Sequence, residues 1–190
     1  MIDLVVGLLF YLASILPLEE APLDSHLPKH TVQMAAWNSA TPAVTDATTL
    51  SIAALETHLS GKLQGTGDTI LVAAQEHGLD PAFLAAIMIW ETGHGSSRAV
   101  QELNNVGGLM DSSGNTLRHF DSVQDSIWFL ANTLQENYVQ EGLVTPAQIQ
   151  KKYAPVGVVN DPTQLNLNWV EGVTSIWLEI RALDGVIAFE

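Results

Sequence analysis

Residues 80–93 read DPAFLAAIMIWETG, and this stretch sets the fold expected for the chain. It opens with Asp80 and Pro81, an N-cap residue followed by a proline at the first helical position, which is the usual start of an α-helix. Apolar residues then recur with helical spacing at Phe83, Leu84, Ile87 and Trp90. This pattern predicts a helix with one buried face. The helix ends in Glu91, before a break at Gly93.

Glu91 is an unusual residue to find at the end of a core helix. A buried carboxylate costs free energy unless it is paired, solvated or protonated. Apolar neighbours and the partial negative charge of the helix C-terminus both disfavour ionisation, so both raise the pKa of Glu91. A carboxylic acid that is protonated near neutral pH can give its proton to a departing oxygen, as the general acid of a glycosidase does. The competing interpretation is a solvated glutamate with no role.

Further helix signals lie on both sides of this stretch, and a small β element interrupts them. The expected helices are 68–77 with Asp68 as its cap, 97–103, 122–138 with Ser122 and Asp125 as a capping box, 145–153, and 169–183 after Asn168. Residues 106–120, VGGLMDSSGNTLRHF, contain two short segments around a turn sequence and predict a β-hairpin. The expected fold class is α+β, mostly α, with one small hairpin between helices.

Before this region the composition changes twice. Residues 4–16, LVVGLLFYLASIL, carry no charge but are shorter than the ~20 residues of a membrane span. They resemble the apolar part of a secretory signal or an anchor, although no basic residue precedes them, and a buried N-terminal helix is the alternative. Prolines and small polar residues then predict a tether. We therefore expect a signal or anchor at 1–18, a linker at 19–65 with room for one short helix, and a domain at 66–190.

Composition narrows the classes of function. The chain has 190 residues, no cysteine and a formal net charge of -14. The absence of cysteine excludes disulfides, thiolate metal sites and a cysteine nucleophile. The negative charge disfavours a nucleic-acid partner, and also adhesion to anionic membranes or wall polymers. No tight cluster of histidines and carboxylates is present, so no metal and no cofactor are expected.

Five sequence blocks, in order, resemble the glucosaminidase domain of bacterial peptidoglycan hydrolases, glycoside hydrolase family 73. They are WETGHGSSRA (90–99), NNVGGLM (104–110), HFDSVQDSIWFLANTL (119–134), KKYAP (151–155) and NDPTQLNLNWVEGV (160–173). The resemblance covers roughly residues 66–180 and implies a lysozyme-like fold. It also implies an exported enzyme of the cell envelope that acts on the glycan strand of peptidoglycan, with a membrane tether through residues 4–16 as one arrangement.

The resemblance implies individual roles. Glu91 matches the general acid, and Tyr153 matches a tyrosine that lies near this acid and assists it. Asn104 and Asn105 match a pair that shapes the cleft beside the β element. Other expected site residues are Phe120, which with Asp121 holds the following helix, and His94, which either lines the cleft or is an ordinary loop residue.

The second catalytic group is left open by the sequence. Glycosidases commonly use two carboxylates, and the candidates are Glu102, Asp111 and Asp121. Asp111 lies in the predicted hairpin and is the residue we expect to face the cleft. A substrate acetamido oxygen can replace this group. Two alternatives to a hydrolase remain. One is a lytic transglycosylase, because the run Gly108-Leu109-Met110 resembles a sequence motif of those enzymes. The other is a catalytically idle glycan-binding protein of the envelope.

Overall fold

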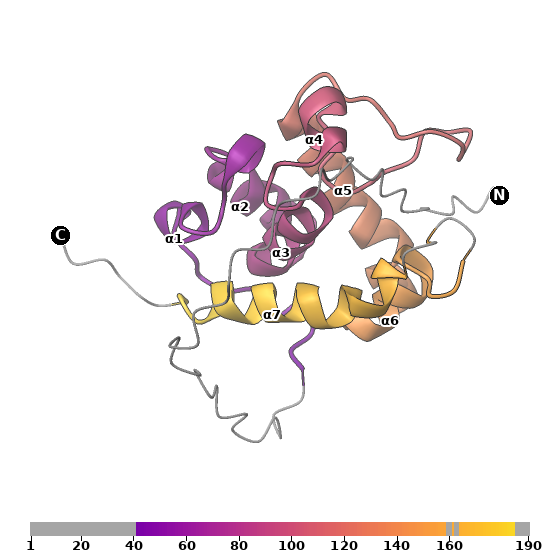
Figure 1. Cartoon of the computed structure of the whole chain (residues 1–190). Coiled ribbons are helices and arrows are strands. Elements are labelled where there is room, and N and C mark those ends of the chain that lie inside the picture. Colours follow the sequence, from indigo (N-terminus) through magenta and orange to yellow (C-terminus); the bar gives the residue numbers. More distant parts are fainter. Residues whose placement is uncertain (1–40, 159–160, 162–163, 185–190) are drawn as a thin grey trace, which may run out of the picture.

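Helix α3 (Pro81–Thr92) is the element around which the others pack, and all of its residues except Trp90 are buried. The computed structural model describes residues 41–158, 161 and 164–184 (Figure 1). The other α-helices are α1 (Ile52–Glu56), α2 (Gly67–Glu76), α4 (Arg98–Leu103), α5 (Val123–Asn137), α6 (Pro146–Tyr153) and α7 (Trp169–Arg181). Three 3₁₀ turns complete the described elements: η1 (Gly61–Leu63), η2 (Val139–Glu141) and η3 (Leu165–Asn168).

The start signals of several helices are confirmed. The Asp80 carboxylate accepts a hydrogen bond from the Ala82 amide, and the Ser122 hydroxyl accepts one from the Asp125 amide. Thr145 and Gln148 form a reciprocal capping box at the start of α6. At α2 the prediction was wrong by two residues, because Thr66 is the N-cap and Asp68 lies inside the first turn.

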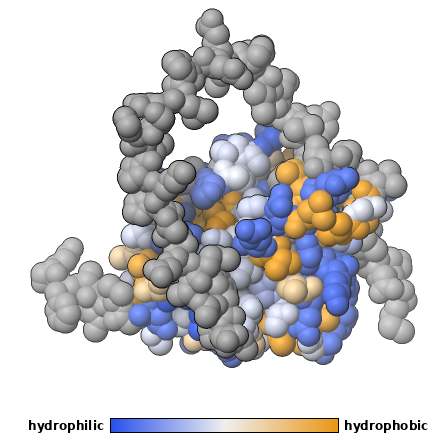
Figure 2. Space-filling view, turned by 60° about the horizontal axis from the view of Figure 1, so that its bottom comes forward, coloured by the Kyte–Doolittle hydropathy of each residue, from blue (hydrophilic) through white to orange (hydrophobic). Residues whose placement is uncertain are grey.

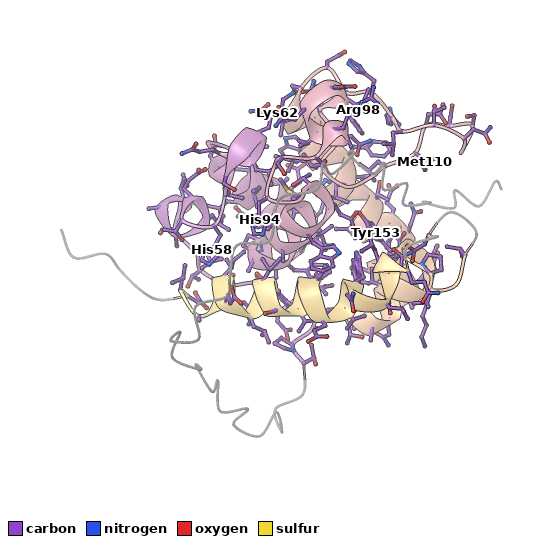
Figure 3. The ribbon with its side chains drawn as sticks, viewed as in Figure 1. His58, Lys62, His94, Arg98, Met110 and Tyr153 are labelled. Carbon is purple, nitrogen blue, oxygen red and sulfur yellow. The ribbon has the colours of Figure 1, made fainter. Side chains whose placement is uncertain are left out.

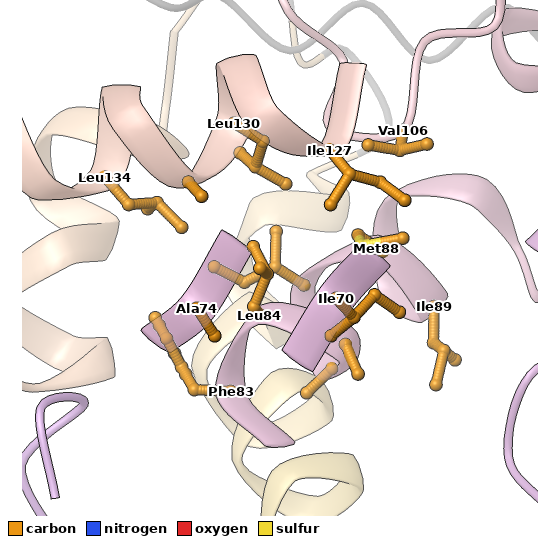
Figure 4. Packing of buried hydrophobic residues seen from close by; sticks show 14 of the residues in the cluster. Ile70, Ala74, Phe83, Leu84, Met88, Ile89, Val106, Ile127, Leu130 and Leu134 are labelled. Atoms are coloured by element: carbon orange, nitrogen blue, oxygen red, sulfur yellow. The ribbon is translucent and has the colours of Figure 1, made fainter. Parts of the chain in front are cut away.

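Helices α2, α3 and α5 enclose the core. Figure 4 shows side chains of α5 facing those of α2 and α3, and all of these side chains are buried. The labelled residues of these three helices are Ile70, Ala74, Phe83, Leu84, Met88, Ile89, Ile127, Leu130 and Leu134. Helix α7 covers another side of α3 and makes the most extensive contact with it (Figure 1). A mostly helical fold is therefore confirmed.

The predicted β-hairpin is wrong for the described residues, which contain no strand. One isolated antiparallel bridge joins Met110 to Leu117. The turn does close, since the Asp111 amide donates to the Thr116 carbonyl at 2.9 Å. A second backbone bond runs from the Arg118 amide to the Leu109 carbonyl at 2.8 Å. Pairing ends after it, because the Asn105 side-chain amide donates to the Arg118 carbonyl at 2.9 Å, at the position where a longer ladder would continue.

The described part of the expected linker, residues 41–65, packs against the domain. Val44, Leu55 and Leu63 in this segment are fully buried. The Thr48 hydroxyl also donates to the Asp80 carboxylate at 2.8 Å, which joins the segment to the start of α3. The short helix allowed for in this region is α1. Residues 1–40 lie outside the described residues, and with them the apolar segment 4–16.

No described helix is long and apolar enough to cross a membrane. On the face shown in Figure 2, hydrophobic and hydrophilic residues are interspersed.

Candidate active site

Glu91 lies in the last turn of α3, and the loop that follows fixes the end of this helix. Gly93 has a left-handed backbone with φ 53° and its amide donates to the Trp90 carbonyl. The His94 amide donates to the Ile89 carbonyl at 2.9 Å. The Thr92 hydroxyl accepts from the Gly95 amide at 2.8 Å. These bonds satisfy the helix end and hold the backbone of Glu91 in place.

The two carboxyl oxygens of Glu91 have different surroundings. Oε1 accepts a hydrogen bond from the indole Nε1 of Trp169 at 2.8 Å. Oε2 is buried and receives no hydrogen bond from any residue that the structure describes. The residue as a whole is 5% exposed. A helix-end glutamate without a role would be solvated. Glu91 is instead buried, and it forms no ion pair with any residue that the structure describes.

Burial raises the pKa of Glu91 from 4.5 to about 8, although the hydrogen bond from Trp169 lowers it in part. Most molecules therefore carry a protonated Glu91 at neutral pH. The sequence predicted this direction, and desolvation is the cause that the structure supports.

Tyr153 lies in the same site. Its buried hydroxyl donates to the Gly107 carbonyl at 2.7 Å, and its ring packs against Trp169 with 5.4 Å between centroids. Burial and then the negative charge of Glu91 raise the pKa of Tyr153 well above its usual value, which places the two side chains near each other. In Figure 3, Tyr153 lies above the N-terminal half of α7. A Cβ on Gly107 would approach the Tyr153 hydroxyl to 3.1 Å, so a glycine is favoured there.

The predicted asparagine pair holds the loop that carries Gly107. The Asn105 side chain is buried, and its amide donates to the carbonyls of Leu109 and Arg118. Its Oδ1 accepts from the amides of Gly107 and Leu109. Asn104 has φ 54°, and its amide donates to the Phe120 carbonyl at 2.8 Å. The Asn105 side chain therefore fixes the loop whose Gly107 carbonyl bonds to Tyr153, and the Asn104 side chain joins the start of this loop to the residues before α5.

His94 and Phe120 lie in different surroundings from Glu91. His94 is exposed, has φ 57°, and lines a pocket of about 260 Å³. The other residues of this pocket are Ile89, Trp90, Gly93, Leu165 and Ile176. Phe120 is buried, and its ring packs against Phe129 with 5.5 Å between centroids. Phe120 therefore helps to hold the start of α5.

None of the three candidate second carboxylates makes a hydrogen bond to Glu91. The carboxylate of Asp111 accepts from the hydroxyls of Ser113 and Thr116, and these bonds lower its pKa from 3.8 to about 2. Glu102 is exposed and pairs with Arg98 at 2.7 Å. Asp121 is exposed, and it directly precedes Ser122, the N-cap of α5.

Trp169 is a site residue that the sequence analysis did not single out. It is fully buried, and its indole N–H donates to the Glu91 carboxyl group. The two residues are 78 positions apart, so no local pattern reports the contact. In the sequence, the position of Trp169 inside the block at 160–173 is the feature that could have pointed to a role in the site. Across the described residues, no group of three metal-ligating side chains is present.

Comparisons with known proteins identify a family and a fold. Residues 67–181 match the glucosaminidase family, described as mannosyl-glycoprotein endo-beta-N-acetylglucosaminidase. Similar solved structures include S. aureus autolysin E, with a TM-score of 0.62 and 17% sequence identity over 75% of this chain and 70% of that chain.

Two further structures of autolysin E contain ligands. One is a complex with the muropeptide NAM-L-Ala-D-iGlu, at TM-score 0.61 and 16% identity, and it covers 75% of this chain and 71% of that chain. The other is a glutamate-to-alanine catalytic mutant in complex with the disaccharide NAG-NAM, at TM-score 0.61 and 15% identity over the same shares. A comparison with curated protein sequences finds no significant match.

Proposed function

The chain belongs to the glucosaminidase family, and from this premise we propose that it is an endo-β-N-acetylglucosaminidase that cleaves the glycan strand of peptidoglycan. The observation that carries the proposal is the burial of Glu91 at the end of α3, which raises the pKa of its carboxyl group to about 8. The peptidoglycan fragments bound by autolysin E support this class of substrate.

In the proposed reaction Glu91 is the general acid. Its proton passes to the glycosidic oxygen of the departing sugar as the bond to the anomeric carbon breaks. A pKa near 8 keeps this proton in place at neutral pH while still permitting its release. The transfer leaves an ionised Glu91, which recovers its proton from the water that finally attacks the anomeric carbon and completes the hydrolysis.

The attack on the anomeric carbon needs a second group. Asp111 is the predicted protein candidate, and its pKa of about 2 keeps it ionised. Its carboxylate is, however, already bonded to Ser113 and Thr116 within its own turn. This arrangement favours the acetamido oxygen of the substrate as the internal nucleophile, with Glu91 as the single protein acid.

Tyr153 assists Glu91 without a hydrogen bond to it. Its hydroxyl bond to Gly107 fixes the loop beside the acid, and its ring packs against the indole that contacts Glu91. We assign Tyr153 to positioning for this reason. The asparagine pair, which holds the same loop, has a related role.

A substrate in the cell wall requires export to the envelope. The apolar segment at 4–16 is the part of the sequence that supports export or a membrane tether.

Digestion of purified peptidoglycan, followed by mass spectrometry of the products, tests the proposed function. The wild type should release reducing N-acetylglucosamine ends, and Glu91→Gln should release almost none. Asp111→Asn should keep activity within about tenfold of the wild type, since one hydrogen-bonded turn is loosened and no reacting group is lost. A loss of more than a hundredfold would instead assign the second role to Asp111.

The same spectra separate the remaining alternatives. Anhydro-muramyl ends would identify a lytic transglycosylase. Binding to the glycan with no product at any pH would identify an idle binding protein, and equal activity of wild type and Glu91→Gln would remove Glu91 from the mechanism.

A further inference from the structure

Helix α7 contacts the two ends of α3 in the same chemical way. The indole N–H of Trp177 donates to the Asp80 carboxylate at 2.7 Å, at the start of α3. The indole N–H of Trp169 donates to the Glu91 carboxyl at 2.8 Å, at the end of α3. Both tryptophans are fully buried. The two carboxyl groups differ in their other hydrogen-bond partners and in whether a positive charge lies beside them.

Asp80 is fully satisfied. Besides Trp177, its carboxylate accepts hydrogen bonds from the Thr48 hydroxyl and the Ala82 amide, and it pairs with the Arg181 guanidinium. Its charge is balanced and both oxygens are occupied. This contact is therefore an anchor between α3, α7 and the N-terminal segment.

Among the described residues, the Glu91 side chain has one hydrogen-bond partner. Trp169 bonds Oε1, while Oε2 has no hydrogen-bond partner among the described residues. An indole N–H can only donate a hydrogen bond, so Oε1 of Glu91 must act as the acceptor in this contact. In a neutral carboxyl group the carbonyl oxygen is that acceptor, and the proton lies on the other oxygen. Because the carbonyl oxygen is the stronger acceptor, the bond to Oε1 favours the form in which the acid proton lies on Oε2.

We propose that Trp169 is a positioning residue for catalysis, whose indole N–H makes Oε2 of Glu91 the proton-donating oxygen and stabilises the carboxylate formed after transfer. This inference rests on the proposed role of Glu91 as general acid. Hydrogen bonds to an ionised acceptor are stronger than those to a neutral one, so the contact tightens as the proton leaves. The Tyr153 ring packs against the Trp169 indole and helps to hold its orientation toward Glu91.

Trp169→Phe tests the proposal, with Trp177→Phe as the matched control in the same helix. Each variant keeps a buried ring and loses one indole bond to a carboxyl group. We expect Trp169→Phe to lower kcat roughly tenfold, the kinetic equivalent of one bond to a charged group, with KM within about twofold. In the pH–activity profile of this variant, the fall in activity at alkaline pH should move to higher pH, because a donor that favoured the ionised form of Glu91 is gone. We call this fall the alkaline limb.

Trp177→Phe should lower the melting temperature and leave the alkaline limb where it is in the wild type. A Trp169→Phe variant with the wild-type pH profile, or with the same profile change as Trp177→Phe, would reduce Trp169 to a packing residue and overturn the proposal.

A measurement on the wild-type protein needs neither variant to fold. In a pH series of ¹H–¹⁵N spectra, the indole N–H resonance of Trp169 should shift with a midpoint near pH 8, together with Glu91. The Trp177 indole should show no transition there. An unmoved Trp169 resonance would overturn the proposal. Failure of the proposed function would appear separately, as a wild type that releases no reducing ends while its Trp169 resonance still titrates.

Discussion

Glu91 illustrates a conflict between stability and reactivity at the scale of one residue. The site keeps this carboxyl group away from water, and no described residue donates a hydrogen bond to Oε2, so the ionised form of Glu91 is disfavoured. The same environment retains the proton that a general acid must donate. The residue should therefore destabilise the fold wherever the unfolded chain would ionise it.

This conflict predicts a pH-dependent gain in stability for Glu91→Gln. Between pH 4.5 and about 8 the folded state holds a proton that the unfolded state has lost, so the contribution of Glu91 to stability falls as pH rises through that window. Glutamine has no such dependence and still offers Oε1 to Trp169. We expect the variant to be more stable by on the order of 1–3 kcal/mol at pH 8 and by little at pH 4.5, in urea titrations.

Glu102→Gln is the control, because this glutamate is exposed and ion-paired. It should give no gain that grows with pH. A stability difference between wild type and Glu91→Gln that stays constant across the window would contradict the raised pKa of Glu91.

At the scale of elements, the contact between α3 and α7 depends on the absence of a side chain at Gly172. A Cβ built at Gly172 would lie 2.0 Å from Cζ3 of Trp90, so the indole of Trp90 occupies the space directly over this glycine. The contact brings α7 close enough for its first residue, Trp169, to reach Glu91.

We therefore predict that Gly172→Ala destabilises the protein by about 1–3 kcal/mol, as overpacking does. The sign is informative, because alanine in a helix is otherwise favoured over glycine by about 1 kcal/mol. Thermal or urea unfolding measures the effect. Ser175→Ala on the exposed side of α7 serves as the control, and adding Trp90→Leu to Gly172→Ala should recover most of the loss. A Gly172→Ala variant at least as stable as the wild type would contradict the packing described.

The helices also show which parts of the structure were predictable. The capping signals at Asp80-Pro81, Ser122 and Thr145 act within four residues, so the sequence reports them directly. The hairpin was not predictable in the same way, because the Asn105 amide takes the carbonyl that a longer ladder would use. The Trp169–Glu91 bond depends on how two helices cross, and no local pattern encodes that.

At the scale of the whole molecule, the hydrophobic core includes residues that precede the part of the chain matched by the glucosaminidase family. The match begins at residue 67, yet Val44, Leu50, Leu55, Leu59 and Leu63 are buried. The segment also braces the loop after Glu91, since the Lys62 amide donates to the Gly95 carbonyl at 3.1 Å and the Ser60 hydroxyl donates to the His94 carbonyl at 2.9 Å.

A chain that begins at residue 67 should consequently be much less stable than one that begins at residue 41. Five buried apolar side chains at about 1.5–3 kcal/mol each correspond to a loss of more than about 5 kcal/mol. Urea titration of the two chains measures the difference, with the full chain as reference. Equal unfolding midpoints would show that residues 41–66 are a tether after all.

The negative charge of the whole chain affects how substrate is recognised. A net charge of -14 provides no attraction for an anionic wall polymer. Long-range attraction between opposite charges is therefore not expected to contribute to recognition of the wall by this enzyme.

The ionisation of Glu91 underlies the proposed reaction and the proposed role of Trp169, and it can be measured directly. In protein labelled with ¹³C at the glutamate carboxyl groups, the resonance missing from Glu91→Gln identifies Glu91, and its shift can be followed from pH 3 to pH 10. We predict a midpoint near pH 8 that coincides with the alkaline limb of glycan cleavage. A midpoint near 4.5, the ordinary value for glutamate, would mean that Glu91 has no proton to donate at neutral pH and would contradict the account.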